Sequence, residues 1–220
     1  MKTNSELQKD VQDAIKWEPL LNSAEIGVIA KDGIVSLTGI VDSYAKKTEA
    51  EEAAKRVSGV KALVENIEVK FPNSFTKTDP EIAKEVLDAL KAAWDVPDDK
   101  VSVKVEDGWV TLEGVLPWNH QKEAAKRVVK YLKGVKGVFN NIKIKSELHD
   151  VIEQKAVKDA LKRSAIDDSD IDVAVSGTTV TLTGLVNSFY AKEEAGRIAW
   201  KTPGIWHVKN ELEVDYEYAF

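Results

Sequence analysis

Few residues of this sequence have the type and spacing needed for metal or acid–base chemistry. The three histidines, His120, His149 and His207, stand far apart, there is no cysteine, and no two histidines have the His-x-x-x-His spacing of a helix. A zinc site needs three or four such side chains in one place. We interpret the histidines as solvent-exposed or packing residues, and we predict no metal site, no cofactor and no catalytic residue.

One acidic stretch has some features of a calcium loop. Residues 168–172 have the sequence DSDID, but an EF-hand loop would need glycine where Val173 stands. Ile171 and Val173 alternate as in a strand. We therefore interpret the stretch as an acidic loop that leads into a strand, with binding of calcium or another cation as the alternative.

A short glycine motif has the form of a nucleic-acid-binding loop. Residues 134–137, GVKG, match the Gly-x-x-Gly of KH domains. A KH loop joins two helices, whereas this segment joins a predicted helix to a predicted strand. Nucleic acid is a disfavoured partner also because the chain has a net charge of −6.

Two tryptophans and a basic helix are the main candidates for binding. Trp109 alternates with Val110 and Leu112, which places it on the solvent side of a predicted strand. Trp118 begins a predicted helix whose basic residues are Lys122, Lys126, Arg127, Lys130 and Lys133. Exposed aromatic and basic residues together suit anionic headgroups or an acidic partner. The alternative is that both tryptophans fill contacts between units and that the basic residues form a solvated face.

A recurring glycine sets the frame for these candidates. The segment VSLTGIV at residues 35–41 returns as VTLEGVL at 110–116 and as VTLTGLV at 180–186. The shared glycines are Gly39, Gly114 and Gly184, and twenty residues after them stand Gly59, Gly134 and Gly204. Such equal offsets indicate three copies of one unit. The first glycine of each copy permits a bend or a close backbone approach at a strand.

Each unit has the same predicted order of helix, strand, strand, helix and strand. Leu90 and the apolar residues before it predict the first helix of unit two, with Asp79 as N-cap and Pro80 at its first position. Three pairs predict tight hairpins: Asp32-Gly33, Asp107-Gly108 and Ser176-Gly177. The second helices are predicted at about residues 44–57, 119–132 and 189–199. A small residue recurs on them at Ala50, Ala125 and Ala195, where it lets the helix lie close to the sheet.

The fold class follows from one apolar sheet face and two amphipathic helices. We predict an α+β protein of three tandem αββαβ two-layer units, each a three-stranded mixed sheet with two helices on one face. The units are repeat 1 (residues 1–72), repeat 2 (77–145) and repeat 3 (147–216), joined by segments 71–78 and 146–147. The net charges of the corresponding thirds of the chain are −2, +2 and −6.

The sequence contains no apolar run long enough for a signal peptide or a membrane-spanning helix. We therefore predict a cytoplasmic protein, or a periplasmic one if a signal was removed.

The repeated pattern resembles the BON domain, named for bacterial osmotically inducible protein Y and nodulation. Leu-x-Gly-x-Val is followed by an alanine-containing helix and by Gly-Val-x-x-Val-x-Asn-x-Ile-x-Val. The match rests on Leu37, Gly39, Val41, Gly59, Val60 and Asn66 in repeat 1, and on Leu182, Gly184, Val186, Gly204 and Ile205 in repeat 3. Repeat 2 departs from the pattern at Leu116-Pro117-Trp118.

The resemblance implies the same αββαβ fold and a role in the bacterial envelope or in osmotic stress. It also implies binding of phospholipid surfaces, and in some members potassium binding or chaperone activity, but no catalytic residues. We predict a non-enzymatic module that contacts a phospholipid surface, a protein partner or a small ion such as potassium or calcium. The alternative is a structural, self-assembling or chaperone-like module.

Overall fold

The computed structural model describes residues 2–72, 77–145 and 154–215, apart from residues 165, 167 and 168. The linker 146–147, part of the linker 71–78, His149 and Asp168 lie outside these residues. Repeat 1 comprises α1 (Asn4–Trp17), β1 (Ile26–Lys31), β2 (Ile34–Val41), α2 (Tyr44–Lys55) and β3 (Ala62–Val69). Repeat 2 comprises α3 (Asp79–Ala92), β4 (Val101–Glu106), β5 (Trp109–Leu116), α4 (Asn119–Lys130), β6 (Gly137–Asn140) and β7 (Lys143–Ile144). Repeat 3 comprises α5 (Gln154–Lys162), β8 (Ile171–Ser176), β9 (Thr179–Val186), α6 (Phe189–Trp200), β10 (His207–Asn210) and β11 (Glu213–Val214).

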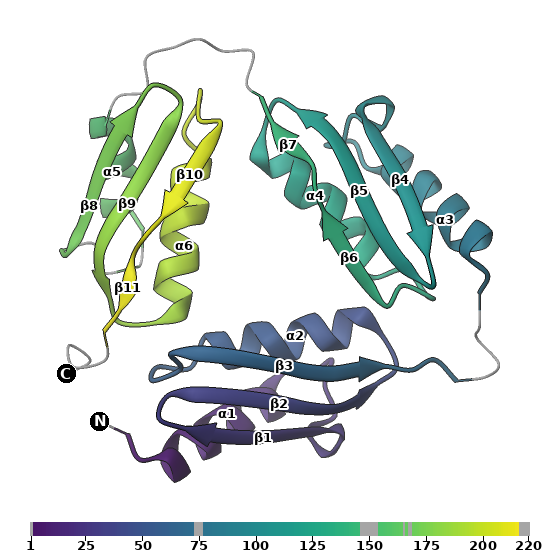
Figure 1. Cartoon of the computed structure of the whole chain (residues 1–220), viewed down its shortest axis with the longest axis horizontal. Coiled ribbons are helices and arrows are strands. Elements are labelled where there is room, and N and C mark those ends of the chain that lie inside the picture. Colours follow the sequence, from purple (N-terminus) through teal and green to yellow (C-terminus); the bar gives the residue numbers. More distant parts are fainter. Residues whose placement is uncertain (1, 73–76, 146–153, 165, 167–168, 216–220) are drawn as a thin grey trace. The chain divides into compact units, whose positions relative to one another are not determined.

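The second strand of each repeat is the centre of its sheet. The first strand pairs with it antiparallel through the hairpin, for example with Val101 opposite Gly114 and Glu106 opposite Trp109. The third strand lies on its other side and, in repeats 2 and 3, runs parallel to it. Both helices of each repeat cover one face of the sheet (Figure 1). This confirms the predicted α+β fold of three repeated units.

The third strand differs among the repeats. It is continuous in repeat 1, but it is in two segments in repeats 2 and 3, β6 with β7 and β10 with β11. Both segments of repeat 2 keep one register on β5, since Leu112 lies opposite Asn140 and Val115 opposite Lys143. The gap therefore interrupts the ladder of hydrogen bonds without shifting which residues face the core.

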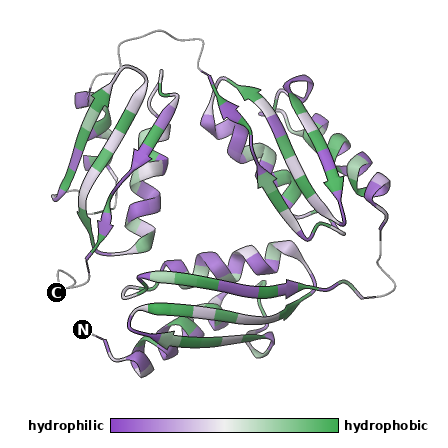
Figure 2. Cartoon of the chain, viewed as in Figure 1, coloured by the Kyte–Doolittle hydropathy of each residue, from purple (hydrophilic) through white to green (hydrophobic). Residues whose placement is uncertain are grey.

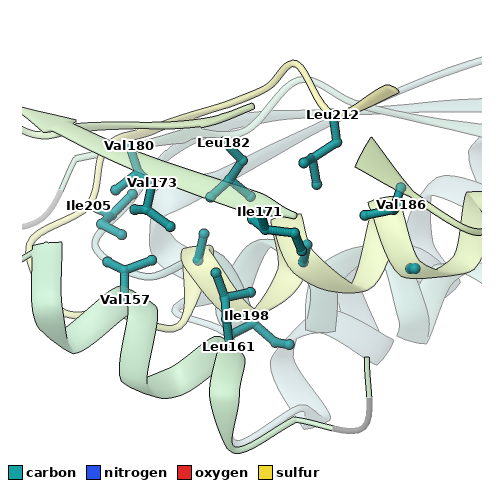
Figure 3. Packing of buried hydrophobic residues seen from close by; sticks show 13 residues of the cluster. Val157, Leu161, Ile171, Val173, Val180, Leu182, Val186, Ile198, Ile205 and Leu212 are labelled. Atoms are coloured by element: carbon teal, nitrogen blue, oxygen red, sulfur yellow. The ribbon is translucent and has the colours of Figure 1, made fainter. Parts of the chain in front are cut away.

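The core of each repeat lies between the sheet and its helices. Hydrophobic residues alternate with hydrophilic ones along the strands (Figure 2), as a sheet with one buried face requires. In repeat 3, Val157 and Leu161 of α5 meet Leu182 of β9 and Ile198 of α6 in one cluster (Figure 3). Ala50, Ala125 and Ala195 are completely buried, which agrees with the predicted close approach of helix and sheet.

The first helix of repeat 2 is capped one residue earlier than predicted. Thr78, not Asp79, is the N-cap of α3, and the carboxylate of Glu81 accepts a hydrogen bond from the Thr78 N–H at 2.8 Å. Thr3 and Glu6 make the same capping box in repeat 1. The hydrogen bond from the N-cap backbone is the main cause of a lowered pKa at both Glu6 and Glu81.

Asp79 instead ties the helix to the hairpin. Its carboxylate accepts hydrogen bonds from the N–H groups of Asp107 at 2.8 Å and Gly108 at 2.9 Å. In repeat 1 the side-chain oxygen of Asn4 accepts one from the Asp32 N–H at 2.8 Å. A polar residue at the start of the first helix therefore holds the hairpin that bears the central strand.

Two of the three predicted hairpin turns have the expected geometry. Asp32 and Gly33, and likewise Asp107 and Gly108, both have positive φ, which is the type I′ pattern. The third turn is displaced by one residue, because β8 extends through Ser176 and the loop is Gly177 and Thr178. Glycine then occupies the first loop position, with φ of 57°.

The recurring glycine of the central strand is required by a backbone contact. A Cβ atom on Gly184 would lie 1.9 Å from the carbonyl oxygen of Asp170, and one on Gly114 would lie 2.1 Å from that of Lys100. A Cβ on Gly39 would lie 2.0 Å from that of Glu25. The φ angles of these glycines are 115°, 151° and 143°, a region that residues with a side chain rarely adopt. The two strands can therefore meet at this end only if the residue is glycine.

We expect Gly184→Ala to unfold repeat 3 selectively. The clash involves backbone atoms that cannot move without breaking the β8–β9 pairing, so the loss should be about 3–4 kcal/mol, most of the stability of a unit this small. Hydrogen exchange measured peptide by peptide should show protection lost in β8 and β9 and kept in repeats 1 and 2. The control is Gly177→Ala, where no atom lies within 4 Å of the added Cβ and only the φ penalty of about 1 kcal/mol applies. Equal losses for the two variants would contradict the explanation.

We expect Asp79→Ala to free the β4–β5 hairpin locally. The amides of Asp107 and Gly108 should exchange about tenfold faster, in line with roughly 1–1.5 kcal/mol for the lost hydrogen bonds. Nuclear magnetic resonance of the two amides measures this directly. Asp79→Asn retains an acceptor, as Asn4 does in repeat 1, and should show a smaller change; unchanged exchange in Asp79→Ala would rule out the tie.

Candidate functional site

Helix α4 of repeat 2 has an excess of basic residues that its counterparts lack. Within Asn119–Lys130, Glu123 is the single acidic residue, and the basic ones are Lys122, Lys126, Arg127 and Lys130. Helix α2 contains three lysines and three glutamates, and α6 contains two basic residues and two glutamates. Among the second helices of the three repeats, only that of repeat 2 therefore has a net positive charge.

The basic residues of α4 form a stripe that begins at Trp118. Trp118, Lys122, Lys126 and Lys130 follow one another at intervals of four residues, so they lie along one side of the helix. All four side chains are half-buried, as expected where lysine stems lie on a protein surface. Trp118 is the N-cap of α4, and its ring centre lies 6.2 Å from that of the exposed His120.

Lys122 is the most embedded position in this stripe. Burial is the main cause of a lowered pKa at its ammonium group. Its backbone carbonyl accepts a hydrogen bond from the side-chain amide of Asn140 at 2.8 Å, which ties α4 to β6. Asn210 makes the same bond to the carbonyl of Lys192 in repeat 3, at 2.6 Å. Lys122 thus belongs partly to the packing of the repeat.

Trp94 is an exposed aromatic residue beside α4 that the sequence did not reveal. Its side chain is 95% exposed, an unusual position for the largest apolar side chain. Its neighbour Asp95 forms an ion pair with Arg127 of α4 at 3.0 Å between Nη2 and Oδ2. This ion pair fixes the segment that bears Trp94 against the basic helix.

Tyr131 extends the same surface at the end of α4. It is 62% exposed, and the ammonium nitrogen of Lys130 lies 5.6 Å from its ring centre. We call Trp94, Lys126, Arg127, Lys130 and Tyr131 the basic–aromatic surface of repeat 2. Such a surface suits a negatively charged partner. The basic side chains attract negative charge, and the aromatic rings have an apolar body with a polar atom that can contact the border between an apolar layer and water.

Trp109 lies elsewhere, on the open face of the sheet. It is 40% exposed and stacks on Phe139, with ring centres 5.2 Å apart and planes at 19°. A Cβ atom on Gly137 would lie 2.2 Å from the Trp109 ring, so glycine there leaves room for the indole. Trp109 thus lies on the solvent side of its strand, as predicted. The structure does not bring Trp109 to α4, because the helices cover the opposite face (Figure 1).

The open sheet face of repeat 1 is also apolar. Ile29, Ile34, Ile40 and Val64 are all exposed there. Ile34 and Val64 occupy the places of Trp109 and Phe139, 75 residues later. In repeat 3 the same two places hold Thr179 and Lys209. The open face is therefore apolar in repeats 1 and 2 and polar in repeat 3.

The other sequence candidates are separate from one another. His120 and His207 are exposed on different repeats, and the described residues contain no group of three or more acidic, histidine or cysteine side chains that could hold a metal ion. Ile171 and Val173 are buried in β8, as the strand interpretation expected. Residues 134–137 join α4 to β6, and Val135 is completely buried. In the part of the chain that the structure describes, no helix is long and apolar enough to cross a membrane.

Comparison with known proteins agrees with the repeated architecture. The BON domain family model matches residues 3–70, 78–146 and 149–216. Osmotically-inducible protein Y of Escherichia coli (strain K12) is 30% identical over 146 residues, covering 64% of this chain and 73% of that protein.

Two solved structures of secretion or periplasmic proteins also align with most of the chain, but too loosely to carry an argument. CdsD, a structural protein of the type III secretion system of Chlamydia trachomatis, aligns with 94% of this chain and 91% of its own at 19% identity and a TM-score of 0.27. The PrgH periplasmic domain aligns with 92% and 98% at 11% identity and a TM-score of 0.22. The three matches of the family model, by contrast, cover nearly the whole sequence, and the chain therefore belongs to the BON domain family.

Proposed function

We propose that this chain is a non-enzymatic binding protein of the osmotic stress response that contacts anionic phospholipid through the basic–aromatic surface of repeat 2. The observation that carries the proposal is the charge excess of α4 beside the exposed Trp94. The association with osmotic stress comes from the similarity to Osmotically-inducible protein Y.

The energetics of such a surface are modest but sufficient for reversible binding. Each lysine or arginine near an anionic bilayer contributes about 1 kcal/mol at physiological salt. Arg127 contributes less, because Asp95 already neutralises part of its charge. Tryptophan and tyrosine prefer the headgroup region, where the ring is in an apolar layer and the polar atom meets water. Trp94 and Tyr131 fit that preference by their exposure.

The ranges 1–72, 77–145 and 147–216 are proposed as three separately folded units. The proposed compartment is the cytoplasm, or the periplasm after removal of a signal. The alternative to a lipid is a small ion, potassium or calcium. The proposed lipid contact does not include Trp109 or Trp118.

A second candidate function is a protein-interaction, self-assembly or chaperone-like role. Its supporting observation is the apolar open face found in each of repeats 1 and 2: Ile29 and Ile34 are exposed in repeat 1, and Trp109 and Phe139 are exposed in repeat 2. Exposed apolar groups on one sheet face often mark contacts between proteins.

The lipid proposal predicts that Lys126→Gln with Lys130→Gln weakens binding to vesicles of phosphatidylglycerol and phosphatidylcholine in equal parts. Loss of two charges should weaken binding roughly 5- to 30-fold at low salt, and Trp94→Ala should weaken it several-fold. Co-sedimentation at rising salt measures both effects. The matched control is Lys104→Gln, which removes a charge from the open sheet face of the same repeat, where Lys104 pairs with Glu106 at 2.8 Å.

The same assay separates the two candidate functions. Full vesicle binding by the Lys126 and Lys130 double variant would sink the lipid proposal for this surface. If Trp109→Thr then abolished self-association or capture of an unfolded client without affecting vesicles, the second candidate would replace it. Thr is the residue that repeat 3 has at the place of Trp109.

A further inference from the structure

A groove of about 550 Å³ opens between the two helices of repeat 3. Arg163 and Ser164 border it after α5, and Glu194, Arg197 and Lys201 border it along and after α6. Its apolar wall includes Ala160 and Ile198. Figure 3 shows Leu161 of α5 and Ile198 of α6 together at the core side of these helices. The volume is within the usual range of sites for small ligands.

The other two repeats use this region for an ion pair between their helices. In repeat 1, Glu18 follows the core residue Ile15 by three positions and pairs with Arg56 at 3.0 Å. In repeat 2, Asp95 follows Leu90 by five positions and pairs with Arg127 at 3.0 Å. Each pair places an acidic residue of the first helix end opposite an arginine of the second helix.

Repeat 3 keeps the cations, and the described residues at the matching positions after its first helix are not acidic. By the repeat spacing, Lys201 stands at the place of Arg56 and Arg197 at the place of Arg127. Three and five positions after Leu161 stand Ser164 and Ile166, neither of which is acidic. A further cation, Arg163, occupies the first-helix side of the groove. Among the residues that the structure describes, no acidic side chain of α5 or its following segment faces these cations across the groove.

The charge of the groove matches a dianion. Glu194 accepts hydrogen bonds from Nε, at 2.6 Å, and from Nη2 of Arg197 within α6, which neutralises one of the three cations. Among the described residues that line the groove, Arg163 and Lys201 then leave a net charge of about +2. This local charge is opposite in sign to the net charge of the third of the chain that contains it.

We infer that this groove binds a phosphomonoester dianion that bears a small organic group. Arginine recognises phosphate oxygens with its planar set of N–H donors, and lysine adds a point charge. Thr202, which has a hydroxyl group, borders the same space. The apolar wall of Ala160 and Ile198 accommodates a short carbon chain, which inorganic phosphate lacks. The inference does not depend on lipid binding by repeat 2, since it uses other residues on another repeat.

The test is calorimetric titration of the full chain with glycerol 3-phosphate at low ionic strength. We expect binding that is stronger than that of inorganic phosphate. It should weaken from about pH 7.5 to about pH 5.5, because a phosphomonoester becomes a monoanion below its second pKa near 6. Arg163→Gln with Lys201→Gln should weaken binding at least tenfold. The control Lys155→Gln with Lys158→Gln removes two charges from α5, outside the groove lining, and should change binding less than twofold.

Glu194→Gln gives an independent test with the opposite sign. Removing the carboxylate that occupies Arg197 should tighten binding of glycerol 3-phosphate several-fold, and a loss of folding cannot mimic tighter binding. Weaker or unchanged binding by Glu194→Gln, or no detectable heat with glycerol 3-phosphate and with phosphatidic acid vesicles, would overturn the inference.

Two further arms identify the source of the phosphate group. Binding of phosphatidic acid vesicles that depends on Arg163, without binding of glycerol 3-phosphate, would indicate a lipid headgroup. Binding of glycerol 3-phosphate without binding of the vesicles would indicate a soluble metabolite. Either result supports a phosphomonoester site in the groove. Equal binding of phosphatidylglycerol and phosphatidic acid vesicles would contradict selection of a monoester. The Lys126 and Lys130 double variant should bind glycerol 3-phosphate normally, so the failure of either proposal can be recognised separately.

Discussion

The close contact between the central strand and the residue before the first strand is the constraint on which each repeat depends. Gly184 meets the carbonyl oxygen of Asp170 where any side chain would overlap it, and Gly39 and Gly114 do the same in their repeats. That contact fixes the register of the hairpin at the end remote from its turn. The register decides which side chains enter the core, and thereby where both helices pack. The lack of a side chain at this one glycine therefore allows the register, and through it the packing, of a repeat of about seventy residues.

Because the core fixes the scaffold, the outer surfaces have diverged without changing the fold. The core positions hold the same types of residue three times, whereas the second helix is neutral, basic and neutral in turn. The open sheet face is isoleucine-rich in repeat 1, aromatic in repeat 2 and threonine-containing in repeat 3. An ion pair joins the ends of the two helices in repeats 1 and 2, whereas a basic groove lies at that place in repeat 3. Three copies of one fold therefore give three chemically different surfaces in one chain.

The fold was predictable from the sequence to a large extent, since its determinants are local and repeated three times. The alternating strands, the turn at Asp107-Gly108 and the small residue at Ala125 each have a direct signal in the chain. The displaced turn at Gly177 and the cap at Thr78 were missed, because two adjacent residues can each meet the local requirement and only the tertiary contact selects one. Asp79 resembles an N-cap in sequence, but the hairpin amides compete for its carboxylate.

The candidate surfaces were harder to predict, because exposure depends on where a helix ends. Trp94 stands four residues after Leu90, a spacing that indicates a core position in a continuing helix. Helix α3 ends at Ala92, so Trp94 leaves the core side and enters solvent. The groove of repeat 3 was not visible in the sequence either, since it depends on the spatial relation of Arg163 to Lys201, residues that are 38 positions apart.

The interrupted third strand has a consequence for the behaviour of the chain at high concentration. An exposed edge strand offers a row of backbone donors and acceptors to which another chain can add its own strand. In repeats 2 and 3 that edge is broken into segments of four and two residues, too short to guide such growth. Among the described third strands only β3, with eight residues, is continuous. Pairing of another chain along the third strand should therefore be more favourable in repeat 1 than in repeats 2 and 3.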